Sequence, residues 1–150
     1  MTETQTFDPT KLDGYEQLLA IGDGRLPGPP IAETLGLVDF GGERGSISVE
    51  LDPEVRHYNP MGFVHGGVLA TMLDTAAGCS VHSTLAAGEA YTSVDLTVKF
   101  LRPVNAESGR LRAVGKVIQR GRRTALAEAQ VVDAQGRLVA HATSTCMTFS

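Results

Sequence analysis

The sequence has no tryptophan, and aromatic residues make up only 5% of its 150 residues. A core with so few large rings must be built mainly from valine, leucine and alanine, whose small side chains let backbones approach closely. An excess of positive charge is also lacking, because 13 lysines and arginines face 17 aspartates and glutamates and the net charge is −4. This composition excludes a broad basic surface for a nucleic-acid backbone, so any phosphate must be bound by a local cluster.

Cysteine and long apolar runs are scarce as well. Cys79 and Cys146 are far apart in the sequence, which indicates buried thiols in a reducing compartment rather than a disulfide framework or a zinc site. Residues 1–10 are polar and acidic, lack the features of a signal peptide, and predict a flexible tail. No run approaches the roughly 20 apolar residues of a membrane span. We therefore expect a cytoplasmic protein with no membrane partner.

Length and composition predict one domain over residues 1–150. Helical spacing predicts a helix at 11–21, a break rich in glycine and proline at 22–30, and one helical turn at 31–35. Two strands are expected at 37–40 and 45–51, around a turn at residues 41 and 42, and a loop at 52–63.

From residue 66 the apolar period becomes that of a long helix, which is expected to end near residue 86, before Gly88. Alternation then predicts a strand at 92–100, with even-numbered residues on its apolar face and Ser93 on the other. Further strands are expected at 110–119, 123–133 and 138–149, joined by short turns. The predicted fold class is therefore α+β, with an antiparallel sheet that one helix covers.

The start of the long helix offers a site for an anion. Gly66 and Gly67 bring N–H groups without partners in the helix to the positive end of its dipole, and they lack a Cβ that would block a ligand. Such groups suit a carbonyl oxygen that becomes an oxyanion, and His65 can add a donor or fix the loop. A tight packing site and a helix cap are the ordinary structural explanations of the same residues.

Asp74 lies about two turns into the same helix, among small residues that let a substrate or another helix come close. Its carboxylate is a candidate general base or nucleophile, although a solvated aspartate is the ordinary alternative. Asn59, in the preceding loop, can orient a water molecule. Because Asp74 is roughly 10 Å along the helix from Gly67, one chain need not supply both halves of a site.

These residues, in this order, resemble the motif of hotdog-fold acyl-CoA thioesterases of the phenylacetate-degradation (PaaI-like) type. That motif has an asparagine, a His-Gly-Gly six residues later, and an acid nine residues after the histidine, as at Asn59, His65 and Asp74. The resemblance runs from about residue 35 to residue 149. It includes the segments Tyr91–Leu96, Phe100–Pro103 and Gly121–Thr124.

The resemblance implies a curved sheet of five to six strands wrapped around one long helix. It implies subunits that pair edge to edge, as a homodimer or a dimer-of-dimers tetramer, with active sites at the interface. The implied reaction is hydrolysis of acyl-CoA thioesters to free acid and CoA without a further cofactor. The Gly67 N–H, helped by His65 or Gly66, would polarise the carbonyl. Asp74 of the partner subunit would act as base or nucleophile.

The remaining assignments also come from the resemblance and from residue chemistry. Asn59 would position water, and Ser93 matches a hydroxyl that orients that water, with Thr92 as the alternative because the predicted alternation turns Ser93 away from the apolar face. The candidates for binding CoA phosphates are Arg102, Arg120, Arg122 and Arg123, although a solvated turn explains each equally well. The candidates for lining an acyl pocket, which plain core packing would also explain, are Met61, Phe63 and Leu73.

Other functions remain open at this level. A non-catalytic hotdog domain that binds acyl-CoA would not need Asp74. A dehydratase of the same fold would need a different arrangement of aspartate and histidine. A metal hydrolase built on His57, His65, His82 and Asp74 has no recognised ligand spacing, and a serine hydrolase would need a G-x-S-x-G motif. We therefore predict no metal site.

Overall fold

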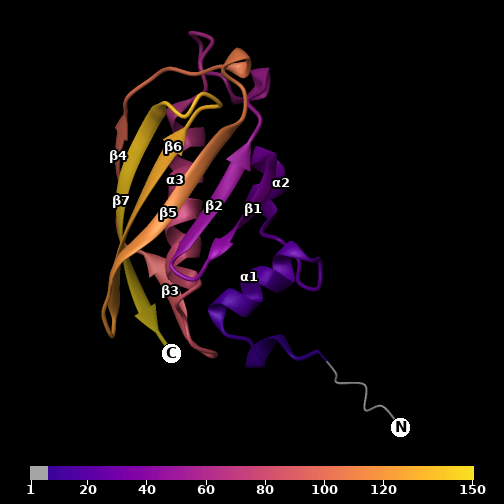
Figure 1. Ribbon diagram of the computed structural model, residues 1–150, viewed down its shortest axis with the longest axis vertical. Helices are drawn as coiled ribbons and strands as arrows, with labels where there is room; N and C mark the ends of the chain where they lie inside the picture. The colour runs from indigo at the N-terminus through magenta and orange to yellow at the C-terminus, as the bar shows by residue number, and fades with distance from the viewer. Residues whose placement is uncertain (1–6) are drawn as a thin grey trace.

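A long helix, α3 (Gly66–His82), packs against one face of a curved antiparallel sheet (Figure 1). The structure, a computed structural model, describes residues 7–150. The strands lie in the order β1 (Leu37–Glu43), β2 (Ser46–Leu51), β5 (Leu111–Arg120), β6 (Thr124–Val132) and β7 (Leu138–Phe149), and the last edge is shared by β3 (Ala90–Ser93) and β4 (Thr97–Phe100). Both β3 and β4 pair with β7, so they occupy one strand position. The predicted hotdog architecture is confirmed.

Small residues let the helix lie close to the sheet. Ala113, Ala127 and Ala129 on β5 and β6 are buried beneath α3. A Cβ at Gly115 would lie 2.2 Å from the carbonyl oxygen of Ala76, so only glycine fits at that point of β5. The scarcity of aromatic residues in the sequence therefore has a structural counterpart in this close contact of helix and sheet.

The segment before the sheet packs near the end of α3. It contains a 3-10 turn (Pro9–Lys11), α1 (Gly14–Gly22) and α2 (Pro30–Leu35). The Gln17 side chain lies 2.8 Å from Nε2 of His82, and the Gly14 N–H donates to the carbonyl of Leu85. Residues 1–6 of the predicted tail lie outside the described residues. Within the described range, no helix is long and apolar enough to cross a membrane.

Several boundaries differ from the sequence predictions. Strand β1 continues through Gly41 and Gly42 to Glu43, so the turn predicted at residues 41 and 42 lies at residues 44 and 45 instead. Helix α3 ends at His82 with Ser83 as its C-cap, and Gly88, with φ +86°, lies in the turn before β3. The strand predicted at 92–100 is interrupted. Ser93 pairs with Cys146 and Thr97 pairs with Thr143, so residues 94–96 of the edge strand lie opposite only residues 144 and 145 of β7.

Three residues of the edge strand opposite two residues of β7 leave one extra residue on the edge strand. This irregularity is a β-bulge, and it reverses which side chains of the strand face the helix. Before the bulge, Tyr91 and Ser93 face α3. After it, Val98 and Phe100 face the helix and core. The prediction of one uniform alternation from 92 to 100 is therefore wrong, because it placed Ser93 and the apolar residues on opposite faces.

Candidate active site

His65 forms the N-cap of α3. Its Nδ1 accepts the Gly67 N–H at 2.8 Å, so the ring is neutral in this arrangement and its proton is on Nε2. The Gly67 N–H that was expected to bind a carbonyl is therefore engaged within the chain. Among residues 7–150, the Gly66 N–H has no acceptor. The donors left at the helix start are this N–H and the Nε2–H of His65.

The helix start is fixed from two sides. The backbone N–H of His65 donates to the carbonyl of His57, and the Val64 N–H donates to Val104, both at 2.8 Å. From the edge strand, the ring of Phe100 covers Gly66, where a Cβ would lie 3.0 Å from the ring. A side chain at Gly66 would therefore press on an aromatic neighbour, in addition to any ligand.

Asn59 organises the loop before the helix. Its Oδ1 accepts the N–H groups of Met61 at 3.0 Å and Phe63 at 3.2 Å, and its own N–H donates to the Phe63 carbonyl at 2.7 Å. Because the side-chain oxygen closes the loop, only the amide NH₂ group is left to contact a water molecule.

Asp74 and Ser93 are brought together. Asp74 is half-buried on α3, and the Ser93 hydroxyl donates to its Oδ1 at 2.9 Å. Ser93 comes from β3, and the bulge after it explains why it faces the helix. Thr92, the alternative candidate, is exposed, and its hydroxyl lies 3.5 Å from the Ser93 carbonyl.

Two further titratable groups lie near Asp74. Burial, followed by the charge of Asp74, raises the pKa of the Cys79 thiol to about 11, so the thiol is protonated at neutral pH and is a poor nucleophile. Burial also raises the pKa of Tyr91, with smaller contributions from Cys79, Cys146 and Asp74. The thiol of Cys79 and the phenol of Tyr91 therefore keep their protons at neutral pH and add no negative charge beside Asp74.

Sequence reasoning missed the aromatic residues that frame the site. Tyr91 packs on Gly78, one turn after Asp74, and Phe100 packs on Gly66. A glycine within a buried helix is a signal of close approach, and Gly78 carried that signal. The sequence did not show that Tyr91 packs on Gly78, because the bulge decides which residues of the edge strand face α3.

The similarity of the chain to known proteins shows its family. The family model of the thioesterase superfamily matches residues 61–140, which contain the helix start, Asp74 and Ser93. The chain belongs to the thioesterase superfamily. A crystal structure of a phenylacetic acid degradation-related protein from Ralstonia eutropha JMP134 is similar, with 34% identity and a TM-score of 0.78, covering 86% of this chain and 97% of that one.

Two curated thioesterases are also similar to this chain. The proofreading thioesterase EntH of Klebsiella pneumoniae is 27% identical over 103 residues, which are 69% of this chain and 74% of EntH. The medium/long-chain acyl-CoA thioesterase YigI of Escherichia coli is 33% identical over 97 residues, 56% of this chain and 61% of YigI. For two further curated relatives, the matched share of the relative's own length is 46% and 87%.

The arginines expected to bind CoA lie at both ends of this thioesterase-superfamily fold. Arg120 is paired with Glu89 at 3.2 Å, while Arg122 and Arg123 are exposed and line a shallow cavity of about 490 Å³ beside the C-terminus. Arg102 follows β4, at the end where α3 begins. Since α3 is about 25 Å long, one chain does not gather all four arginines into one patch.

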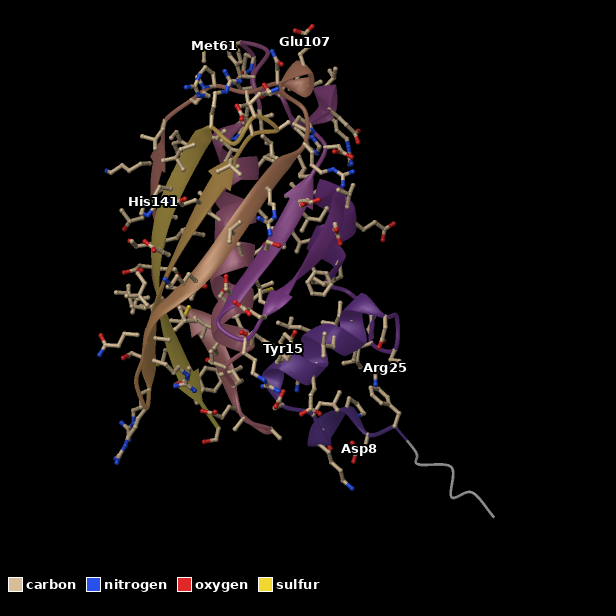
Figure 2. The ribbon with its side chains drawn as sticks, viewed as in Figure 1. Asp8, Tyr15, Arg25, Met61, Glu107 and His141 are labelled. Atoms are coloured by element: carbon tan, nitrogen blue, oxygen red, sulfur yellow. The ribbon has the colours of Figure 1, made fainter. Side chains whose placement is uncertain are left out.

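The candidates for the acyl pocket are also separated. Met61 is 77% exposed at the end of the molecule where α3 begins (Figure 2), and Phe63 is half-buried nearby. Leu73 is fully buried in the core. This burial fits the alternative of plain core packing for Leu73, because residue 73 lies on the stripe of α3 that faces the sheet.

The histidines of the metal alternative have structural partners. Nδ1 of His57 accepts the Glu54 N–H and its Nε2 lies 2.7 Å from the Leu35 carbonyl, while His82 contacts Gln17. In the described part of the chain, no group of three histidine, cysteine, aspartate or glutamate side chains is placed to hold a metal ion.

Proposed function

We propose that this protein hydrolyses acyl-CoA thioesters to a free acid and CoA. The observation that carries the proposal is the Asp74–Ser93 hydrogen bond of 2.9 Å, on a helix that begins with His65-Gly66-Gly67. Membership of the thioesterase superfamily supports the reaction class. The name of YigI, a medium/long-chain acyl-CoA thioesterase, supports CoA as the carrier.

In the proposed reaction, the helix start binds the thioester oxygen. The Nε2–H of His65 and the N–H of Gly66 donate to this oxygen, and the positive end of the helix dipole stabilises its charge as a tetrahedral intermediate forms. The thiolate of CoA then leaves. The Gly67 N–H contributes by donating to Nδ1 of His65, which keeps the ring proton on Nε2.

Asp74 acts in the attack on the carbonyl carbon, either as a base or as the nucleophile. Ser93 donates to Oδ1, so Oδ2 is free to accept a proton from water as that water attacks the carbonyl carbon. In the alternative route the same oxygen attacks and forms an anhydride, which water then hydrolyses. The NH₂ group of Asn59 orients the water in both routes. No metal or organic cofactor takes part in this proposal.

We further propose that the site is shared between two subunits. Within one chain, the helix start and Asp74 are about 10 Å apart along α3, and the arginine candidates lie at both ends of the helix. A two-fold axis at the β3–β4 edge would run two such edges antiparallel and bring one helix start toward the partner's Asp74. That edge exposes Val94 (58%), Phe100 (56%) and Leu101 (56%), which suit a homodimer or a dimer of dimers.

In such a dimer, the CoA phosphates would bind arginines from the two chains. Arg122 and Arg123 line a cavity with Thr148, Ser150 and Glu89. Glu89 is paired with Arg120, and no ion pair joins Arg122 or Arg123 to an acid among residues 7–150. Arg102 would come from the other subunit. The proposal includes a cytoplasmic location, which the two free cysteines support.

The proposed function is tested with Asp74→Asn, which keeps the shape of the side chain and removes the base. We expect turnover of acyl-CoAs to fall about 10²–10⁴-fold, the usual effect of a lost general base. Release of free thiol is followed over a panel of aryl and aliphatic acyl-CoAs, with circular dichroism as the check on folding. The matched control is Asp39→Asn on the exposed strand β1, which should leave turnover unchanged.

Near-wild-type hydrolysis by folded Asp74→Asn would overturn the role of Asp74. Binding of acyl-CoA without release of thiol by the wild-type protein would favour the non-catalytic alternative.

A further inference from the structure

The edge strand is irregular at the point where it passes Asp74. Between β3 and β4, the N–H groups of Val94 (2.8 Å) and Asp95 (3.4 Å) both point at one acceptor, the carbonyl of Thr145 on β7. Two donors that share one acceptor opposite them are the hydrogen-bond pattern of a β-bulge. This bulge directly follows Ser93.

Asp95 and Ser144 hold the bulge in place. The Asp95 carboxylate accepts the Thr145 N–H at 2.8 Å, which takes the place of a ladder hydrogen bond. The buried Ser144 hydroxyl donates to the Asp95 carbonyl at 3.0 Å. Asp95 is exposed, and the contact with Thr145 requires only an acceptor oxygen rather than a charge.

The bulge decides which side chains face α3. In a regular strand, residues 93 and 100 point to opposite faces, because the side-chain period is two. Here both face the helix: Ser93 donates to Asp74 and Phe100 covers Gly66. A regular strand could form only one of these two contacts. The extra residue within 94–96 allows both to form.

We propose that Asp95 is a positioning residue for the hydrolytic site, because its side chain stabilises the bulge that turns Ser93 toward Asp74. The inference rests on the proposed function, since Asp95 acts through Ser93 and contacts no substrate. In this proposal, the role of Asp95 is to shape the site and not simply to add charge to the surface.

The test compares Asp95→Ala, which removes the acceptor, with Asp95→Asn, which keeps an oxygen at the same place. We expect Asp95→Ala to lower kcat about as far as Ser93→Ala, roughly tenfold or more, with KM within about twofold. Asp95→Asn should stay within about threefold of wild type. Because Asp95 acts through Ser93, the double variant Asp95→Ala/Ser93→Ala should be no slower than Ser93→Ala alone.

Two checks separate positioning from general damage. Tm and size-exclusion profiles are recorded for each variant, and Asp39→Ala on the opposite edge strand is the control. If Asp95→Ala does not fold, Ser144→Ala takes its place and is combined with Ser93→Ala in the same way. Ser144→Ala removes the other contact of the bulge, the hydrogen bond to the Asp95 carbonyl.

Three results would overturn the inference. The first is a wild-type kcat in folded Asp95→Ala, and the second is an additive effect of Asp95→Ala in the Ser93→Ala background. The third is a loss of kcat only in variants whose oligomer dissociates. The same three results leave the proposed function intact if Asp74→Asn is inactive. Full activity of Asp74→Asn would instead overturn the proposed function itself.

Discussion

At the scale of single residues, Gly78 shows how a missing side chain shapes the site. The phenol of Tyr91 occupies the space beside Gly78, and an added Cβ would lie 2.6 Å from the Tyr91 oxygen and 3.3 Å from two ring carbons. Tyr91 is two residues before Ser93 on β3, and its ring also forms an edge-to-face pair with the ring of His82, at a centroid distance of 5.7 Å. The contact with Gly78 therefore helps to place the strand that carries Ser93.

We expect Gly78→Ala to lower the free energy of unfolding by about 1–3 kcal/mol, the usual effect of overpacking, even though alanine is the better helix former. Adding Tyr91→Phe should recover most of this loss, because the nearest clashing atom is the hydroxyl oxygen. Urea denaturation of the two single variants and the double variant measures both effects. Wild-type stability of Gly78→Ala would show that the strand moves freely away from the helix.

At the scale of elements, the helix start combines a cap with a candidate donor in one side chain. His65 caps α3 through Nδ1, while its Nε2–H is the proposed donor to the substrate. His65→Ala removes both functions and should lower stability by about 0.5–2 kcal/mol, the effect of losing an N-cap. His65→Asn restores a good capping oxygen without a donor at the place of Nε2.

We therefore expect His65→Asn to be as stable as wild type in chemical denaturation, yet to lose about 10²–10³-fold in kcat, the effect of removing one oxyanion donor. Thermal melts and thiol release measured on the same preparations separate the two roles. If His65→Asn keeps wild-type turnover, His65 is a cap alone and the carbonyl is bound by backbone N–H groups.

The elements also show how far the sequence predicts the structure. Helix α3, strand β7 and the antiparallel order follow from hydrophobic periodicity, which depends only on burying one face of each element. The edge strand does not follow, because its apolar residues alternate regularly from Thr92 to Phe100 while the backbone does not. The bulge is set by tertiary contacts of Asp95 with β7, and no local pattern carries them.

The candidate site was predictable only where it depends on spacing along the chain, and not where it depends on tertiary contacts. Asn59, His65 and Asp74 are fixed by spacing along the chain, and the structure places them on one loop and helix as expected. The proximity of Ser93 to Asp74 and of Phe100 to Gly66 required the fold. The pairing of Arg120 with Glu89 also required it, because these residues are 31 positions apart in the sequence.

At the scale of the whole molecule, the candidate groups are spread along α3. The donors at the helix start, the Asp74–Ser93 pair and the exposed Arg122 and Arg123 follow one another from one end of the helix to the other. An antiparallel partner at the β3–β4 edge reverses this order, so each substrate would contact the helix start of one chain and the acid of the other.

Mixing two inactive variants tests this arrangement directly. Asp74→Asn keeps an intact helix start, and His65→Asn keeps an intact acid. If sites are shared, random re-pairing should restore about a quarter of wild-type turnover, because half of the dimers are mixed and each mixed dimer holds one intact site of two. Co-expression with two different affinity tags, followed by tandem purification, isolates the mixed dimer, whose turnover should be about half that of wild type by the same reasoning. An inactive mixed dimer would place the whole site within one chain, and Asp74 would then have to reach a carbonyl bound about 10 Å away along its own helix.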